Sequence, residues 1–301
     1  MKNGWILAVI LIVIGIGLLM AVGVFTDFDL RNLSTGKAME NHTYTIDEPV
    51  SSVLVSDTFC DLRLLPAEDG VCTAVCSENE DFYCDVTVQN GTLTITRRDK
   101  EKWYAKIGIF TADNQGSVIV YLPEGIYDSL ELSTASGDIT LEPGLQARQV
   151  TIGSTSGDLE LSGLTAKSVE LSTTSGDQAL KQMTADTLLA SSVSGDFRLD
   201  QCSFGSLTLN TTSGELSLTD SLCSGFAQIS TTSGDIRFTR FDAGSMEISS
   251  TSGDVTGTLL TGKDFETNTV SGEVWVKAYD STGGKCSINT VSGEIHLDLA
   301  S

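Results

Sequence analysis

The chain repeats one short motif nine times at a nearly constant spacing. Two copies read "STTSGD", at 172–177 and 230–235, and two others read "NTVSGE", at 268–273 and 289–294. The repeated serine recurs every 19 to 21 residues, at Ser136, Ser156, Ser175, Ser194, Ser213, Ser233, Ser252, Ser271 and Ser292. Self-similarity at such a period is the signature of a repeat architecture in which each unit stacks on its neighbours.

Apolar and polar residues alternate on both sides of the motif. The position four before the serine is usually Leu or Ile, as in Leu132 and Ile152, and the position two before it is always Ser or Thr. The positions three and five after it are mostly Ile, Leu, Val or Phe. This alternation is typical of strands with one buried face, and no unit shows the 3.6-residue period of a helix.

The sequence therefore predicts an all-β fold, a parallel β-solenoid with about 19–20 residues per coil. Right-handed coils are expected from the usual chirality of parallel crossovers. Nine coils spaced ~4.8 Å apart would form a rod ~43 Å long. The glycine after each serine predicts a corner with positive φ. An antiparallel sandwich of hairpins is the alternative, but a sandwich does not require the same letters at a fixed period.

The N-terminal part differs in composition from the repeats. After a short tail at 1–4, residues 5–25 read "WILAVILIVIGIGLLMAVGVF", which is long and apolar enough to predict one transmembrane helix. Residues 26–45 are polar and predict a tether, and 46–126 carry strand-like runs that predict degenerate coils or a cap. Within them, "DTFCDLRL" at 57–64 resembles the repeat "TTSGDIRF". Residues 127–301 hold the nine SGD and SGE repeats.

Charge constrains the location and the partners. Lys2 precedes the apolar segment and Asp27 and Asp29 follow it, which favours a single-pass membrane protein with its C-terminal body outside the cell. The net charge is −22, and residues 127–301 contribute 9 basic and 23 acidic residues, a balance of −14. Phosphate backbones would be repelled, so nucleic acid is not an expected partner.

The anchor, the stretch "SVIVYLPEGIYDSLELSTASGDI" at 117–139 and the serial SGD and SGE coils resemble a bacterial family. It is a β-strand-repeat domain family of unknown function that is often labelled "putative adhesin". The resemblance covers roughly residues 46–301 and implies a β-solenoid in the bacterial envelope, with no reaction and no site residues to transfer. A surface binding or scaffold module that holds glycan or an envelope protein is the function it favours. An accessory role in envelope-stress signalling, through a membrane partner, is the alternative.

Few residues are suited to catalysis. The two histidines, His42 and His296, are not near a serine–acid arrangement, so neither an enzyme nor a cofactor is expected. One candidate metal site is the carboxylate column two positions after the serine: Asp138, Asp158, Asp177, Asp196, Glu215, Asp235, Asp254, Glu273 and Glu294. A row of stacked carboxylates could bind calcium, but a solvated acidic edge is the favoured interpretation, because a tight oxygen cage rarely tolerates Glu for Asp.

Two further groups are candidate partner contacts. Trp275 and His296 occupy one outward column near the C-terminal end, and Trp103 and Tyr104 lie in the basic stretch "RRDKEKWYAK" at 97–106. Of the seven cysteines, Cys202, Cys223 and Cys286 occupy columns expected in the core. The other four, Cys60, Cys72, Cys76 and Cys84, could pair in three ways if the body is outside the cell.

Overall fold

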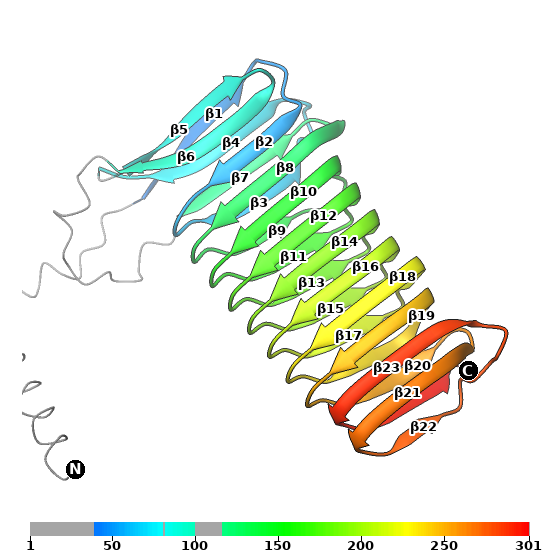
Figure 1. Cartoon of the computed structure of the whole chain (residues 1–301). Coiled ribbons are helices and arrows are strands. Elements are labelled where there is room, and N and C mark those ends of the chain that lie inside the picture. The colour runs from blue at the N-terminus through cyan, green and yellow to red at the C-terminus, as the bar shows by residue number, and fades with distance from the viewer. Residues whose placement is uncertain (1–38, 81, 100–115, 301) are drawn as a thin grey trace, which may run out of the picture. The chain divides into compact units, whose positions relative to one another are not determined.

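The computed structural model describes residues 39–80, 82–99 and 116–300, which fold into 24 β-strands and build one rod (Figure 1). The predicted transmembrane segment 5–25 and residues 26–38 of the tether lie outside the described residues. Within the part of the chain that the structure describes, no helix is long and apolar enough to cross a membrane.

Each repeat forms one coil, which consists of a longer strand, a corner with the SGD or SGE motif, and a shorter strand. The longer strands build the long sheet: β8 (Ile126–Thr134), β10 (Gln146–Ser154), β12 (Thr165–Thr173), β14 (Thr184–Ser192), β16 (Ser203–Thr211), β18 (Leu222–Thr231), β21 (Lys263–Ser271) and β23 (Gly284–Ser292). The shorter strands build the short sheet: β9 (Ile139–Leu141), β11 (Leu159–Ser162), β13 (Gln178–Lys181), β15 (Phe197–Asp200), β17 (Leu216–Thr219), β20 (Val255–Leu259), β22 (Val274–Val276) and β24 (Ile295–Leu299). β19 (Ile236–Ser250) runs through both sheets, because its first residues pair with β17 and its last with β18.

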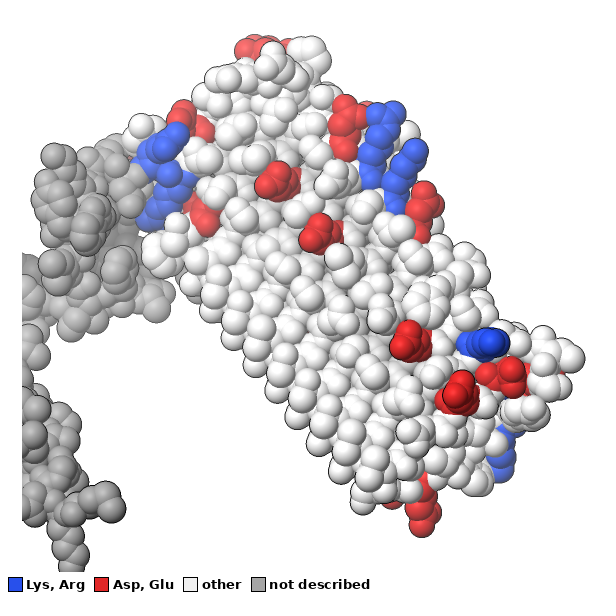
Figure 2. Space-filling model, viewed as in Figure 1, with Lys and Arg blue, Asp and Glu red and all other residues white. Residues whose placement is uncertain are grey.

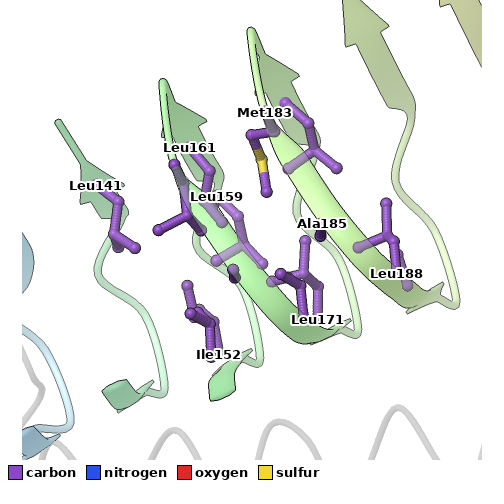
Figure 3. Close-up of a cluster of buried hydrophobic side chains, with 14 of the residues drawn as sticks. Leu141, Ile152, Leu159, Leu161, Leu171, Met183, Ala185 and Leu188 are labelled. Carbon is purple, nitrogen blue, oxygen red and sulfur yellow. The ribbon is translucent and has the colours of Figure 1, made fainter. Parts of the chain in front are cut away.

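Neighbouring coils pair in parallel and in register, which confirms the predicted parallel β-solenoid. Leu171 of β12, for example, lies opposite Ile152 on one side and Ala190 on the other. The same column is therefore apolar and buried along the rod, except at Thr267 in the coil β21–β22, and it faces the apolar columns of the short sheet. Figure 3 shows this core, with Leu141, Leu159 and Leu161 of the short sheet and Ile152 and Leu171 of the long sheet buried in the interior of successive coils. Each such side chain stabilises the fold by about 1.5–3 kcal/mol relative to an exposed one.

The corner glycines do not have positive φ, so the sequence-based prediction of a left-handed corner is wrong. They are needed because successive corners stack in close contact. A Cβ at Gly195 would lie 2.0 Å from the carbonyl oxygen of Gly176, and one at Gly176 would lie 2.0 Å from that of Gly157. The hydroxyl two positions before each serine also belongs to the corner, as where Ser154 Oγ accepts the N–H of Gly157 at 2.8 Å.

At the N-terminal end, the first coil in the sequence lies one position further from the end of the rod than the second coil. The strands there are β1 (Glu40–Ile46), β2 (Ser52–Ser56), β3 (Asp61–Pro66), β4 (Cys72–Glu78), β5 (Phe82–Gln89), β6 (Thr92–Asp99) and β7 (Ser117–Leu122). β2 pairs in parallel with both β8 and β6, and β3 with both β9 and β7. The "DTFCDLRL" stretch thus forms a corner and strand of the coil β2–β3. Beyond the coil β6–β7 the sheets continue with antiparallel strands, β5 on β6, β4 on β7, and β1 on β4.

The coils at the C-terminal end are out of sequence order, which corrects the prediction that successive repeats stack on one another. β23 pairs with β19 on one side and with β21 on the other, and β24 lies between β20 and β22. The ninth repeat is therefore inserted between the seventh and the eighth, and the coil β21–β22 is outermost.

Apolar content explains this order. The inserted coil points Cys286, Ile288, Ile295 and Leu297 inward, and each is at most 1 % exposed. The outermost coil has Thr267 at the position equivalent to Ile288, so less free energy is lost by leaving it at the end of the core.

Lys263 of the outermost coil holds the inserted coil in place. Its backbone lies opposite Gly284 of the inserted coil. Its Nζ lies 2.6 Å from Asp242 Oδ1, in a pair that is almost fully buried, and it donates to the carbonyl oxygen of Ala243 at 2.6 Å. Asp242 and Ala243 belong to the coil on the other side of the insertion. A buried lysine needs a charged partner. Since Lys263 finds that partner in the coil beyond the inserted one, the contact ties three coils together.

Candidate binding surfaces

The predicted carboxylate column exists, and it is a hydrogen-bonded ladder. Oδ1 of each aspartate accepts the backbone N–H of the carboxylate residue in the next coil, from Asp177 to Asp158 at 2.8 Å and from Asp196 to Asp177 at 3.0 Å. The ladder begins at Asp61 of the first coil and reaches Glu294 through Asp254. Aspartate thus has a structural function here, because its short side chain links adjacent coils.

Glutamate occupies the column where the ladder is interrupted or ends. Among the described coils, the step from Glu215 to Asp235 lacks the N–H bond, and Glu215 Oε1 instead accepts from Arg237 at 2.8 Å. Glu294 and Glu273 belong to the last two coils in space. The longer arm of glutamate therefore occurs mainly where few or no further coils follow.

Two arginines partly neutralise the middle of the column. Arg198 donates to Asp177 at 2.9 Å and to Asp196 at 2.8 Å, and Arg237 also reaches Asp235. Partial burial raises the pKa of Asp177, but the N–H of Asp196 and the Arg198 guanidinium outweigh this effect and lower its pKa below the ordinary 3.8. No three Asp, Glu, His or Cys side chains are arranged to hold a metal ion in the described residues. Calcium binding at the column stays the untested alternative to a structural acidic edge.

Two of the four candidate partner-contact residues lie at the C-terminal end. Trp275 and His296 lie directly opposite one another on β22 and β24, with ring centroids 3.9 Å apart. Lys277 Nζ lies 3.8 Å from the centroid of the Trp275 ring, and His296 Nε2 lies 3.6 Å from Asp298 Oδ2. Val270, Val274 and Tyr279 are exposed nearby. This cluster combines an aromatic anchor, apolar side chains and charges of both signs, the composition typical of protein contacts.

The flank of the rod is different in character. In Figure 2 one long edge carries almost no charged side chains, whereas charges gather toward the two ends. A hollow of about 500 Å³ near the C-terminal end is lined by Phe226, Asp264, Lys285 and residues beside them on β19, β21 and β23. Its one cysteine, Cys286, is buried, and burial raises the pKa of that thiol to about 12, which makes it a poor nucleophile.

All seven cysteines are buried and have free thiols. Cys202, Cys223 and Cys286 lie in the core as predicted. At the N-terminal end, burial and nearby Asp57 raise the pKa of Cys60 to about 12. Trp103 and Tyr104 lie outside the described residues.

Family comparison decides what kind of protein this is. The model of the Toastrack DUF4097 family matches residues 60–239 and 225–301, which is most of the chain. The chain belongs to the Toastrack DUF4097 family. The family has no established function, and no curated protein matches the chain.

Three solved structures similar to this chain come from Bacteroides fragilis and Parabacteroides distasonis. A "putative adhesin" from Bacteroides fragilis is similar with a TM-score of 0.52 and 12% identity, over 87% of this chain and 98% of that one. A "putative lipid binding protein" from Parabacteroides distasonis has a TM-score of 0.47 and 15% identity, over 86% and 96%. A "putative adhesin" from the same species has a TM-score of 0.43 and 12% identity, over 84% and 97%. At these identities the likeness shows the fold alone.

Sequence reasoning missed two features of this Toastrack rod. The buried pair of Lys263 and Asp242 was not predicted, because it spans the inserted ninth coil, and the insertion is not evident from the repeat pattern. The exposed end of the core was also missed. A signal for it exists, because Thr267 is the only polar residue in its column.

Proposed function

We propose that this Toastrack rod is a non-enzymatic binding or scaffold module of the bacterial envelope, held by a single N-terminal membrane anchor with its C-terminal end as the contact surface. The observation that carries the proposal is the cluster around Trp275, where a Trp–His ring contact, Lys277 and exposed valines share one end of the molecule. Aromatic residues that are rigidly held and partly exposed are the usual energetic centres of protein interfaces.

Three further observations support it. The described chain holds no group of three potential metal ligands and its thiols are buried. The apolar segment 5–25 is long enough to span a bilayer. The structural neighbour from Bacteroides fragilis is described as a "putative adhesin".

Protease added to intact cells tests the location. We expect it to degrade the body of the full-length chain without lysis. Degradation only after lysis would contradict an external body and favour the signalling role from inside the cell.

Binding of displayed full-length protein to isolated envelope material tests the surface. Trp275→Ala should weaken binding at least tenfold, because a truncated hot-spot residue typically costs 2 kcal/mol or more, a loss of roughly 30-fold. Val193→Ala is the matched control, since Val193 is exposed to a similar extent, 50 % against 39 % for Trp275, but lies on the middle of the rod. Equal binding by both variants would show that the contact surface lies elsewhere.

A further inference from the structure

The outermost coil exposes positions that are buried in the coil beside it. Val274 is 44 % exposed, whereas Ile295, the residue opposite it, is 1 % exposed. Thr267 and Thr269 are only partly buried, whereas the opposite residues Ile288 and Thr290 are buried. The apolar interior of the solenoid is therefore open to solvent at this end, which is unfavourable unless something covers it.

The backbone is open at the same place. Among the described strands, β21 has only β23 as a strand neighbour and β22 only β24. On the outer side of β21, only Lys263 is paired, with the segment around Tyr279. The rest of β21 and β22 therefore present a row of unpaired N–H and C=O groups on their outer side. Such edges are templates for pairing with another strand.

The opposite end of the molecule shows what kind of strand completes these sheets. There, the outermost parallel strand of each sheet is followed by an antiparallel one, β4 on β7 in the short sheet and β5 on β6 in the long sheet. A partner for the C-terminal end should likewise supply two antiparallel strands, one to each sheet.

We propose that the partner is a second copy of this chain, joined end to end about a two-fold axis. A two-fold axis normal to both sheets places β21 antiparallel to its copy and, at the same time, β22 antiparallel to its copy. The proposal rests on the proposed function in one respect, since it takes the C-terminal end as the contact surface, and it names the partner that this surface binds.

The short sheet is self-complementary in charge about Trp275. With Trp275 opposite its copy, Val274 faces Val276, and Glu273 faces Lys277 in both directions. Opposite charges that face each other across an antiparallel pair are favourable, as are apolar pairs. Two ion pairs and a Trp–Trp contact would therefore flank one axis.

The long sheet is compatible with the same axis about Thr267. That register places Phe265 opposite Thr269 on the inner face and Glu266 opposite Asn268 on the outer face, with no like charges in direct opposition. A register centred on Glu266 would place two carboxylates opposite each other. Thr267 and Trp275 each lie four residues from Ser271 at the corner, so a single axis can pass through both centres.

An end face of two short strands is a small interface, below the ~1,200 Å² of standard complexes, so the dimer should be weak in solution. Membrane anchoring raises the effective concentration. The test therefore uses the full-length chain in its membrane.

Cysteine trapping tests the register. Residues directly opposite in an antiparallel pair have Cα atoms ~4.5–5.5 Å apart, within disulfide range. Under mild oxidation, Thr267→Cys and Trp275→Cys should each give a disulfide-linked dimer on a non-reducing gel. Asn268→Cys should not, because its own copies would lie about 8 Å apart, and neither should Val193→Cys on the rod's flank. The seven native thiols are all buried, which keeps the background low.

Charge exchange tests the same interface by another route. In the Thr267→Cys background, Glu273→Lys or Lys277→Glu should reduce trapping severalfold, and the double exchange should restore it. Absence of trapping at both 267 and 275 would overturn the proposal, as would trapping of a different protein at these positions. Either result would leave the envelope-binding assay of Trp275→Ala unaffected, so failure of the dimer and failure of the proposed function are distinguishable.

Discussion

At the N-terminal end of the rod the outermost coil β6–β7 is covered by the antiparallel strands β4 and β5. At the C-terminal end the described chain adds no further strand beyond β21–β22, only the segment around Tyr279 that pairs with Lys263. Both ends nevertheless share one arrangement. The coil that comes first or last in the sequence is the second coil from the end of the rod. At the N-terminal end, the Arg97 guanidinium lies 3.4 Å from the centroid of the Phe82 ring, and this contact between β6 and β5 adds to the cover of that end. At the C-terminal end Trp275, Val270 and Val274 face solvent.

This difference separates two demands on a solenoid end. Stability favours the most apolar terminal coil lying inside, and the C-terminal end meets this requirement by inserting the coil β23–β24. At the N-terminal end the inserted coil β2–β3 and the coil β6–β7 both bury aliphatic side chains at the equivalent positions. Protection of the parallel coils requires that the edges of the outermost coil be covered by further strands, and among the described strands this happens only at the N-terminal end, where β4 and β5 pair with β7 and β6. An end that is stable but uncovered is suited to contact with a partner.

The largest expected effect distinguishes corners in the middle of the rod from the corner at its open end. Gly195→Val should cost about 3 kcal/mol or more, because its Cβ would overlap the carbonyl oxygen of Gly176 and both neighbouring coils resist movement. Gly272→Val meets a similar contact, 2.1 Å from Gly293, but its coil can move outward, so its cost should be smaller. Urea unfolding measures both.

Gly153→Val is the control for this comparison. The nearest atom to a Cβ at Gly153 lies 3.7 Å away, and a β-branched residue suits a strand. Its stability should change by less than about 0.5 kcal/mol. A large loss at Gly153 or none at Gly195 would contradict the close-contact explanation.

A somewhat smaller effect should follow from loss of the buried charge pair at the open end. Lys263→Met leaves Asp242 buried without its partner and should destabilise the coils around the insertion by about 3 kcal/mol. Lys277→Met removes a lysine that is 61 % exposed and should change stability by less than about 0.5 kcal/mol. Thermal unfolding of the two variants, with hydrogen exchange to locate the loss, checks the difference.

The order of the last two coils can be tested through the column that differs between them. Ile288→Thr should cost about 2 kcal/mol, since it removes buried apolar surface and buries a hydroxyl. Thr267→Ile should be neutral or slightly stabilising in the monomer, because Thr267 is only partly buried. Denaturant unfolding measures both, and equal costs at the two positions would refute apolar content as the reason for the inserted order.

The aspartate ladder should contribute less per residue, and only in the covered coils. Asp177→Ala should cost about 1 kcal/mol at pH 7 through loss of the acceptor for the N–H of Asp196, whereas Asp177→Asn keeps an acceptor and should cost less. Glu273→Ala, in the outermost coil, should have no measurable effect.

The pH dependence of Asp177 has a definite sign. Because its folded-state pKa is lowered below 3.8, the carboxylate stabilises the fold above about pH 4, and this contribution is lost as the pH falls through the folded-state pKa. Melting temperatures of wild type and Asp177→Asn should therefore converge in acid. A wild-type advantage that grew below pH 4 would contradict the ladder.

The smallest expected effect concerns cations. If the carboxylate column is a structural ladder, millimolar calcium should shift the melting temperature no more than magnesium or sodium chloride at equal ionic strength. Stabilisation specific to calcium, lost when Asp177, Asp196 and Glu215 become Asn, Asn and Gln, would instead identify a row of binding sites.

The local pattern of the sequence determines the architecture of one coil. The repeat period, the alternation around Ile139 and Leu141 and the hydroxyl before each corner identify two strands and a turn, because these are short-range consequences of side-chain geometry. The carboxylate column and the Trp275–His296 contact could be predicted for the same reason, since residues at equal positions in adjacent coils must lie side by side.

The order of coils could not be read in this way. Repeats eight and nine share the letters "NTVSGE", so either could stack on the seventh with the same corner contacts, and only the summed burial of Ile288, Ile295 and Leu297 decides between them. Only the tertiary structure shows why the corner needs glycine, since a left-handed φ and a close contact between coils would both require this residue. Both outcomes depend on what lies in the neighbouring coil, and this information is absent from any single repeat.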